Sequence, residues 1–179
     1  MVTFAIDPAH TDALFTAKHM MVTNVRGKFT DVSGTIEIDE SDPSASSADI
    51  TIRAASLDTG FGARDAHLRS DHFFAVETYP EIRVTSTGIR PKGRNDFVVT
   101  ADVTIRDITR PVDFDVEFLG FYPAMDGARR AGFTATAKVN RKDWGLDWNV
   151  ALEAGGLLVG DTVKLEVEVA LQQALALAA

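Results

Sequence analysis

Hydrophobic and polar residues alternate strictly along most of the chain. In the segment DFVVTADVTIRD, alternation places Phe97, Val99, Ala101, Val103 and Ile105 on one face. The same period-two pattern recurs at residues 48–56, 111–121, 131–140 and 161–171. Such alternation is typical of strands with one buried and one solvated face, and these strands belong to antiparallel sheets. The pattern therefore predicts an all-β protein.

Further strands are expected at residues 2–7, 14–21, 28–39 and 80–89, which makes about nine strand candidates. Between the strands lie segments rich in Gly, Pro, Asn and Asp, such as DESDPSAS and RPKGRND, which are typical of turns. Consecutive strands with short connections and one apolar face close into a sandwich or a barrel. We expect a single domain over residues 1–172 and a C-terminal tail at 173–179.

Several positions expected to face the interior carry alanine. They are Ala17, Ala54, Ala101, Ala135 and Ala137. A filled core favours bulkier side chains at such positions, so the alanines indicate room for a ligand. Alternatively, each alanine packs under a large neighbour and leaves no space. The sequence alone leaves both interpretations open.

Composition narrows the function. The chain has 179 residues and 45% hydrophobic residues, which suits one globular domain. It contains no cysteine, which excludes disulfides, cysteine nucleophiles and thiolate metal sites. A formal net charge of −8 argues against nucleic acid as a partner. No apolar run is long enough to span a membrane, and MVTFAIDPAH lacks the features of a signal peptide, so we expect a cytoplasmic protein.

Charged and aromatic residues cluster in the segment RDAHLRSDHFF, which starts at Arg64. Asp65 and Arg69 are four residues apart with the acid first, a spacing that stabilises a helix. Glycines at positions 60 and 62 allow the chain to turn into that helix. We therefore expect a short helix near residues 62–70, fixed by an Asp65–Arg69 ion pair.

Catalytic and metal-binding motifs are absent from the sequence. His67 and His72 lie about 140° apart around a helix, whereas paired zinc ligands on one helix are three or four residues apart. The chain contains no GxSxG, HExxH, GxGxxG or phosphate-binding glycine loop. We expect no metal, no cofactor and no catalytic residue. His19 alternates with Phe15 and Ala17, so it is expected to face the interior and is the candidate base if the protein is an enzyme.

Eight motifs, in order along nearly the whole chain, resemble those of the YceI-like, polyisoprenoid-binding family. They are IDPAHT, FTAKHM, GKFTDVSGTI, RDAHLRSDHFF, YPEIRVTSTGI, TIRDITRPV, NRKDWGL and VGDTVKLEVEV. The resemblance implies an extended lipocalin-like antiparallel barrel of about eight strands. It also implies a helix at RDAHLRS, an apolar tunnel that holds a long isoprenoid chain, and a possible homodimer.

The resemblance and the alternation together identify candidate residues for the tunnel wall. They are Phe15, Ala17, His19, Phe29, Phe73, Phe74, Ala101, Phe133, Ala135 and Ala137. Arg64 or Arg69 is a candidate contact for an anionic lipid head group. The expected function is non-catalytic binding, carriage or sequestration of a long-chain isoprenoid or quinone-like lipid. The alternatives are an enzyme that acts on an isoprenoid-like substrate and a protein-interaction barrel without a ligand.

Overall fold

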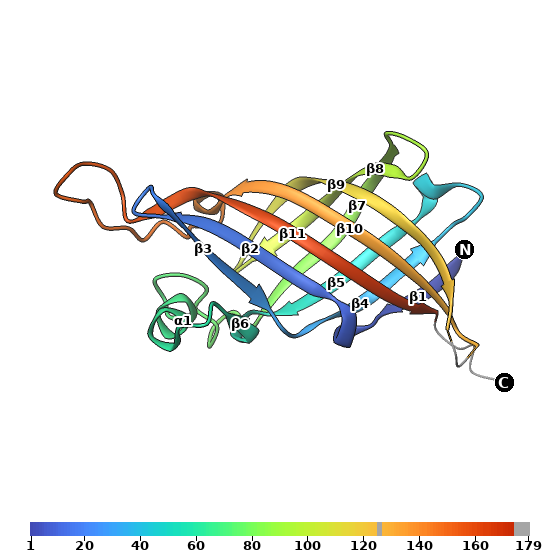
Figure 1. Ribbon diagram of the computed structural model, residues 1–179, viewed down its shortest axis with the longest axis horizontal. Coiled ribbons are helices and arrows are strands. Elements are labelled where there is room, and N and C mark those ends of the chain that lie inside the picture. Colours follow the sequence, from blue (N-terminus) through green and yellow to red (C-terminus); the bar gives the residue numbers. More distant parts are fainter. Residues whose placement is uncertain (125–126, 174–179) are drawn as a thin grey trace.

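A computed structural model describes residues 1–124 and 127–173, and in it one sheet curls into an elongated barrel (Figure 1). The strands are β1 (Val2–Ile6), β2 (Asp12–His19), β3 (Thr23–Phe29), β4 (Val32–Ile38), β5 (Ser47–Arg53), β6 (Leu57–Asp58), β7 (Glu81–Pro91), β8 (Asp96–Ile105), β9 (Ile108–Pro123), β10 (Arg129–Asn140) and β11 (Val159–Gln173). All their pairings are antiparallel, which confirms the all-β prediction. Of the tail expected at 173–179, all but Gln173 lies outside the described residues.

Eight strands form a closed ring in the order β1–β4–β5–β7–β8–β9–β10–β11, and β11 returns to β1. The other strands of the described residues, β2, β3 and β6, continue positions of this ring after short breaks. Both β1 and β2 pair with β11, while β3 pairs with β2 and β6 pairs with β3. Three of the eight positions are thus filled by two successive strands. This arrangement confirms the expected antiparallel barrel of about eight strands.

One of the further expected strands is interrupted. The strand expected at 28–39 separates into β3 and β4 at Thr30 and Asp31. The backbone N–H groups of both residues donate to the hydroxyl oxygen of Ser56, at 3.2 and 3.1 Å, instead of to a neighbouring strand. A side chain from another segment therefore ends the ladder between Phe29 and Val32, which are three residues apart and so do not follow a period of two.

The helix expected near residues 62–70 is confirmed as α1 (Gly62–Arg69). It lies beside β6 at one end of the barrel, and the N-terminus lies toward the other end (Figure 1). Short 3₁₀ helices are η1 (Pro8–His10), η2 (Pro43–Ala45), η3 (Ala54–Ser56) and η4 (Arg141–Trp144). Among the described residues, no helix has the length and apolar character needed to cross a membrane.

Two clusters of buried apolar side chains stabilise the barrel. Phe4 and Leu171 are fully buried in the first cluster, where β1 meets β11. The second cluster contains Trp144 and Leu146, and the indole Nε1 of Trp144 donates to the carbonyl oxygen of Val103 at 2.9 Å. Burial of each large apolar side chain contributes roughly 1.5–3 kcal/mol. Close side-chain packing in these two clusters therefore stabilises the barrel, since a hollow interior contributes fewer such contacts.

Candidate ligand-binding cavity

The barrel encloses a cavity of about 560 Å³. Inward-facing side chains from all eight strand positions line it, and nearly all of them are apolar. Ala135, Val99 and Val167 point inward from three strands but are only half-buried, because they border this space. Cavities that hold small molecules typically measure roughly 300–1,000 Å³ and have mostly apolar walls. The cavity therefore has the size and polarity of a lipid-binding site.

Eight of the ten residues predicted for the tunnel wall border this cavity. They are Phe15, Ala17, Phe29, Phe73, Phe74, Ala101, Phe133 and Ala135. The other two do not border it. His19 is the last residue of β2, opposite Thr23 and Val159, and Ala137 packs against the cluster that contains Trp144. For all ten residues, contact with a ligand stays a prediction.

Much of the aliphatic wall is not among the residues predicted from the sequence. Ile36 on β4, Ile50 on β5 and Val84 on β7 also border the cavity. The alternation that predicted the strands already marks these positions, since each inward-facing residue of a hollow barrel lines its interior. The predicted wall contained aromatic residues, His19 and alanines, and no aliphatic residue larger than alanine.

Aromatic side chains from α1, from the segment after it and from the loop before β11 meet at the α1 end of the cavity. The ring of Trp148 lies 4.4 Å from the ring of His67, 5.8 Å from His72 and 5.6 Å from Phe73. Nε2 of His67 lies 2.9 Å from Nδ1 of His72, because the chain turns back after α1. No group of three His, Cys, Asp or Glu residues within the described ranges is arranged to hold a metal ion. This cluster therefore joins the segment after α1 to the loop before β11.

The predicted Asp65–Arg69 ion pair is wrong. Asp65 is 7% exposed. Its carboxylate accepts hydrogen bonds from two groups of Thr59, the backbone N–H at 3.0 Å and the side-chain hydroxyl at 2.5 Å. Arg69 donates instead to the carbonyl oxygens of Ala55 and Leu57, at 2.9 and 2.6 Å. In the described sheet, β6 pairs on one side only, so carbonyl groups on its other side need donors. Tertiary partners replace the helical i,i+4 pair.

Arg64 is also engaged by the segment before α1. It donates from Nε to the hydroxyl oxygen of Thr59 at 2.7 Å and from Nη2 to the carbonyl oxygen of the same residue at 2.9 Å. Its guanidinium carbon lies 5.8 Å from the centre of the Phe61 ring. Neither Arg64 nor Arg69 borders the cavity. Contact of either residue with a lipid head group stays a prediction.

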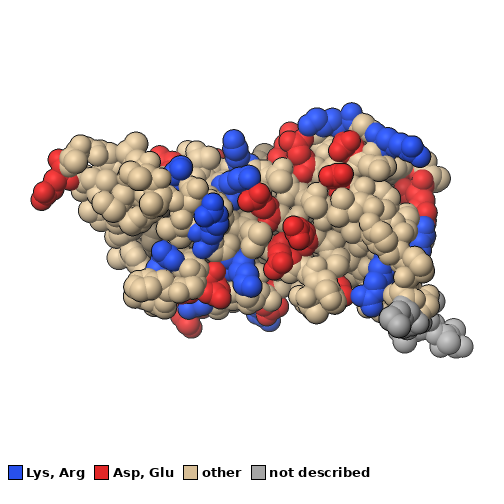
Figure 2. Space-filling view, viewed as in Figure 1, with Lys and Arg blue, Asp and Glu red and all other residues tan. Residues whose placement is uncertain are grey.

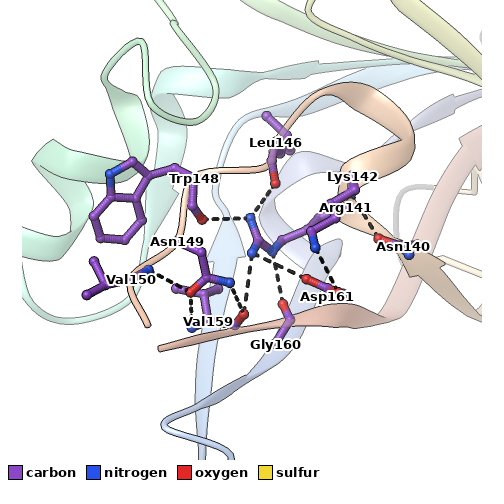
Figure 3. A network of polar contacts seen from close by, with 10 residues as sticks. All are labelled: Asn140, Arg141, Lys142, Leu146, Trp148, Asn149, Val150, Val159, Gly160 and Asp161. Carbon is purple, nitrogen blue, oxygen red and sulfur yellow. Dashed lines mark hydrogen bonds and ion pairs between the residues drawn. The ribbon is translucent and has the colours of Figure 1, made fainter. Parts of the chain in front are cut away.

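Arg141 borders the cavity just after β10 and is only 5% exposed (Figure 3). Its guanidinium donates to the carbonyl oxygens of Leu146, Trp148, Val159 and Gly160. It also pairs with Asp161 at 3.5 Å. Burial lowers the pKa of Arg141, and the negative charges of Asp161 and Asp147 oppose this effect. Arg141 thus fastens the loop before β11 to the first residues of that strand and has its donors occupied.

The exposed residues that border the cavity place its opening to solvent between the β4–β5 and β7–β8 connections. Figure 1 shows that these connections lie at the end of the barrel away from α1. Apart from Leu14 in β2, the exposed residues that border the cavity all lie there: Glu40, Pro43, Ser47, Arg94 and Asn95. A hydrogen bond of 2.8 Å from the backbone N–H of Ala48 to the hydroxyl oxygen of Ser86 joins the two sides. This polar rim could not be predicted from the sequence, because most of its residues lie in turns, outside the alternating pattern.

Known proteins are similar to this chain in sequence and in fold. The family model for the YceI-like domain matches residues 4–171. The UPF0312 proteins SAS2572 and MW2606 of Staphylococcus aureus, strains MSSA476 and MW2, are each 36% identical to the chain over 167 residues, covering 93% of it and 95% of the relative.

Solved structures with the same fold include Burkholderia cenocepacia BcnA, with a TM-score of 0.79, 22% identity, and coverage of 92% of this chain and 98% of that one. The Campylobacter jejuni YceI protein has a TM-score of 0.75 and 28% identity, with 88% and 90% covered. A polyisoprenoid binding domain from Saccharophagus degradans has a TM-score of 0.71 and 17% identity, with 97% and 100% covered. The family model and the relatives cover the barrel from β1 to β11, and the chain belongs to the YceI-like domain family.

Proposed function

We propose that the protein binds a long-chain isoprenoid or similar lipid inside the barrel and carries or sequesters it without catalysing a reaction. The observation that supports this most directly is an apolar cavity of about 560 Å³ that opens to solvent at one end of a closed barrel. The Saccharophagus degradans domain with this fold is described as polyisoprenoid-binding, which agrees with the proposal. A quinone-like ligand and a homodimer stay predictions.

Burial of a prenyl chain supplies enough free energy for binding. Each buried CH₂ group contributes roughly 0.8 kcal/mol, so about fifteen isoprenoid carbons contribute on the order of 12 kcal/mol. Ordering the flexible chain and fixing it in the protein opposes this by several kcal/mol. The balance corresponds to a dissociation constant of about 1 μM or lower. Polar contacts with the tail are not required.

The ionisable groups at the cavity wall support a binding role rather than a chemical one. Among the described lining residues they are Asp39, Glu40, Arg94 and Arg141. A hydrogen bond from Ser41 lowers the pKa of Asp39, and one from Arg129 lowers the pKa of Glu40. Both groups are therefore carboxylates at neutral pH and weak bases. His19, the base considered from the sequence, is not among the lining residues.

Substitution of Ala135 by Phe tests whether the cavity holds the lipid. Ala135 faces the cavity from the middle of β10, opposite Val116 on one side and Val167 on the other. A phenyl group there occupies the space of the proposed ligand. We expect the variant to fold with a melting temperature close to that of the wild type and to lose lipid. Binding of farnesol by calorimetry and mass spectrometry of an organic extract measure the loss.

Thr136→Phe is the matched control, because Thr136 is exposed on the outer face of the same strand. It should retain farnesol binding. An Ala135→Phe variant destabilised by about 1–3 kcal/mol would indicate that the interior is already filled. A stable Ala135→Phe variant with normal binding would place the lipid outside the cavity. Either outcome contradicts the proposed function.

A further inference from the structure

The two ends of the cavity differ in the chemistry that they offer to an amphiphile. Toward α1, the wall is formed by apolar side chains such as Leu68, Phe73 and Leu146, together with Arg141, whose donors are occupied by carbonyl oxygens. At the opposite end, the rim presents the hydroxyl, amide and guanidinium groups of Ser47, Asn95 and Arg94. An amphiphile in this cavity therefore has its tail toward α1 and its polar head at the rim.

Basic residues gather beside this rim. Figure 2 shows Lys and Arg side chains at the upper right, where Figure 1 places the turn between β7 and β8. This turn region carries Arg90, Lys92 and Arg94. Arg90 pairs with Asp113 at 3.3 Å and Lys92 pairs with Asp115 at 2.7 Å, so acidic groups on β9 neutralise both.

Arg94 differs from its two basic neighbours in both respects that matter for a ligand. It borders the cavity, and they do not. Within residues 1–124 and 127–173, its guanidinium forms no hydrogen bond or ion pair, and it is exposed. The cationic side chains considered at the α1 end, Arg64, Arg69 and Arg141, all donate to oxygens of the chain itself. Arg94 is therefore the cation at the cavity wall with donors available to a ligand.

The carboxylates of the rim are already engaged. Glu40 forms a double contact with Arg129, with 2.8 Å between Nη2 and Oε2. Asp39 accepts hydrogen bonds from the hydroxyl of Ser41 at 2.6 Å and from the backbone N–H of Asp42 at 3.0 Å. Glu40 thus has a cationic partner of its own, and neither carboxylate forms an ion pair with Arg94 in the part of the chain that the structure describes.

Given a lipid in the cavity, as the proposed function states, we propose that Arg94 binds an anionic head group, such as the phosphate or diphosphate of a prenyl chain. The tail lies along the apolar wall toward α1, and the head remains at the solvated rim. Asn95 and Ser47 border the same opening and supply neutral hydrogen-bond donors. Guanidinium groups bind phosphate oxygens through charge-assisted, often paired hydrogen bonds.

Two probes with the same tail distinguish the contribution of the head group to binding from that of the tail. Farnesol and farnesyl diphosphate are titrated into the wild type, Arg94→Gln and Arg90→Gln, and dissociation constants are measured by calorimetry. Arg90→Gln is the matched control, because Arg90 lies at the same turn but pairs with Asp113. The dissociation constant of farnesol divided by that of farnesyl diphosphate should fall about tenfold in Arg94→Gln. The reason is that the diphosphate loses one charge-assisted interaction, whereas farnesol loses none. The ratio should stay unchanged in Arg90→Gln.

Each contrary result has a distinct meaning. An unchanged ratio in Arg94→Gln, or an equal loss of both probes, overturns the role of Arg94 while lipid binding in the cavity stands. A ratio that falls in Arg64→Gln or Arg69→Gln instead places the head group at the α1 end and also overturns the proposal. If farnesol and farnesyl diphosphate both fail to bind the wild type, the proposed function fails and the head-group site fails with it.

Discussion

Basic side chains at the α1 end of the barrel and at its open end have different partners. At the α1 end, Arg69 and Arg141 donate to backbone carbonyl oxygens, and Arg141 is 5% exposed. At the open end, Arg90 and Lys92 pair with aspartates on β9, and all four side chains are well exposed. Water screens an exposed ion pair strongly. Removal of a buried guanidinium, in contrast, takes a hydrogen-bond donor away from every oxygen that it contacts.

This contrast shows that the environment decides what an arginine contributes. Where the chain leaves carbonyl oxygens without strand partners, as at β6 and in the loop before β11, arginine supplies the missing donors. Where the strand backbones pair with each other, as next to the β7–β8 turn, carbonyl oxygens do not need arginine donors. The cations there pair with exposed aspartates or, as with Arg94, face solvent. The α1 end is thus expected to govern stability, and the open end is expected to govern binding.

The largest effect is expected at Arg141. Arg141→Met should lower the free energy of unfolding by about 3–5 kcal/mol, because four carbonyl oxygens and Asp161 each lose a donor, and for Leu146 and Trp148 no other donor is present among the described residues. Lys142→Met is the control, since Lys142 is exposed and also pairs with Asp161, at 3.1 Å. It should cost less than about 1 kcal/mol. Denaturant unfolding measures both, and equal effects would contradict the contrast between buried and exposed cations.

An intermediate effect is expected at Asp65. Asp65→Ala should lower the free energy of unfolding by about 1–3 kcal/mol, because the backbone N–H and hydroxyl of Thr59 lose a buried acceptor. Asp71→Ala provides the comparison, since Asp71 is exposed just after α1. It should unfold like the wild type. Identical thermal unfolding of the two variants would mean that Asp65 is solvated in solution.

The smallest effect is expected at Glu40 on the open end. The hydrogen bond from Arg129 lowers the pKa of Glu40, so the carboxylate form is favoured in the folded state. Its stabilisation is present above the pKa of the unfolded chain and is lost as the pH falls through the lowered folded value. Glu40→Gln should therefore change the melting temperature only slightly at neutral pH and not at all in acid. A change as large as that of Asp65→Ala would show that the rim is not screened by water.

The strands and α1 could be predicted because their signals are local. Alternation over residues 96–107 or 161–171 has one structural solution, and Asp65 and Arg69 do have helical spacing. Their partners could not be predicted, since the i,i+4 rule does not account for the carbonyl groups that β6 presents to α1. Local spacing therefore predicts that α1 forms, but the hydrogen-bond partners of its side chains depend on tertiary contacts.

The cavity was only partly predictable for a similar reason. Inward-facing residues such as Phe133 and Ala135 follow from alternation. Arg94 lies in a turn, and its proximity to the cavity depends on how the β4–β5 and β7–β8 connections meet. Arg141, in the motif NRKDWGL, resembles a surface cation in sequence and becomes buried only when the loop before β11 folds over it.

The closure between β1 and β11 has a consequence for solubility. Three residue pairs form this seam: Phe4 with Gln173, Ala5 with Gln172, and Ile6 with Leu171. A sheet that stayed open there would present two unpaired edges, and such edges recruit strands from other molecules. A hollow barrel also exposes its apolar interior once it opens. Together with the pairs between β2 and β11, these backbone pairs therefore protect the strand edges and the apolar interior from aggregation between copies of the chain.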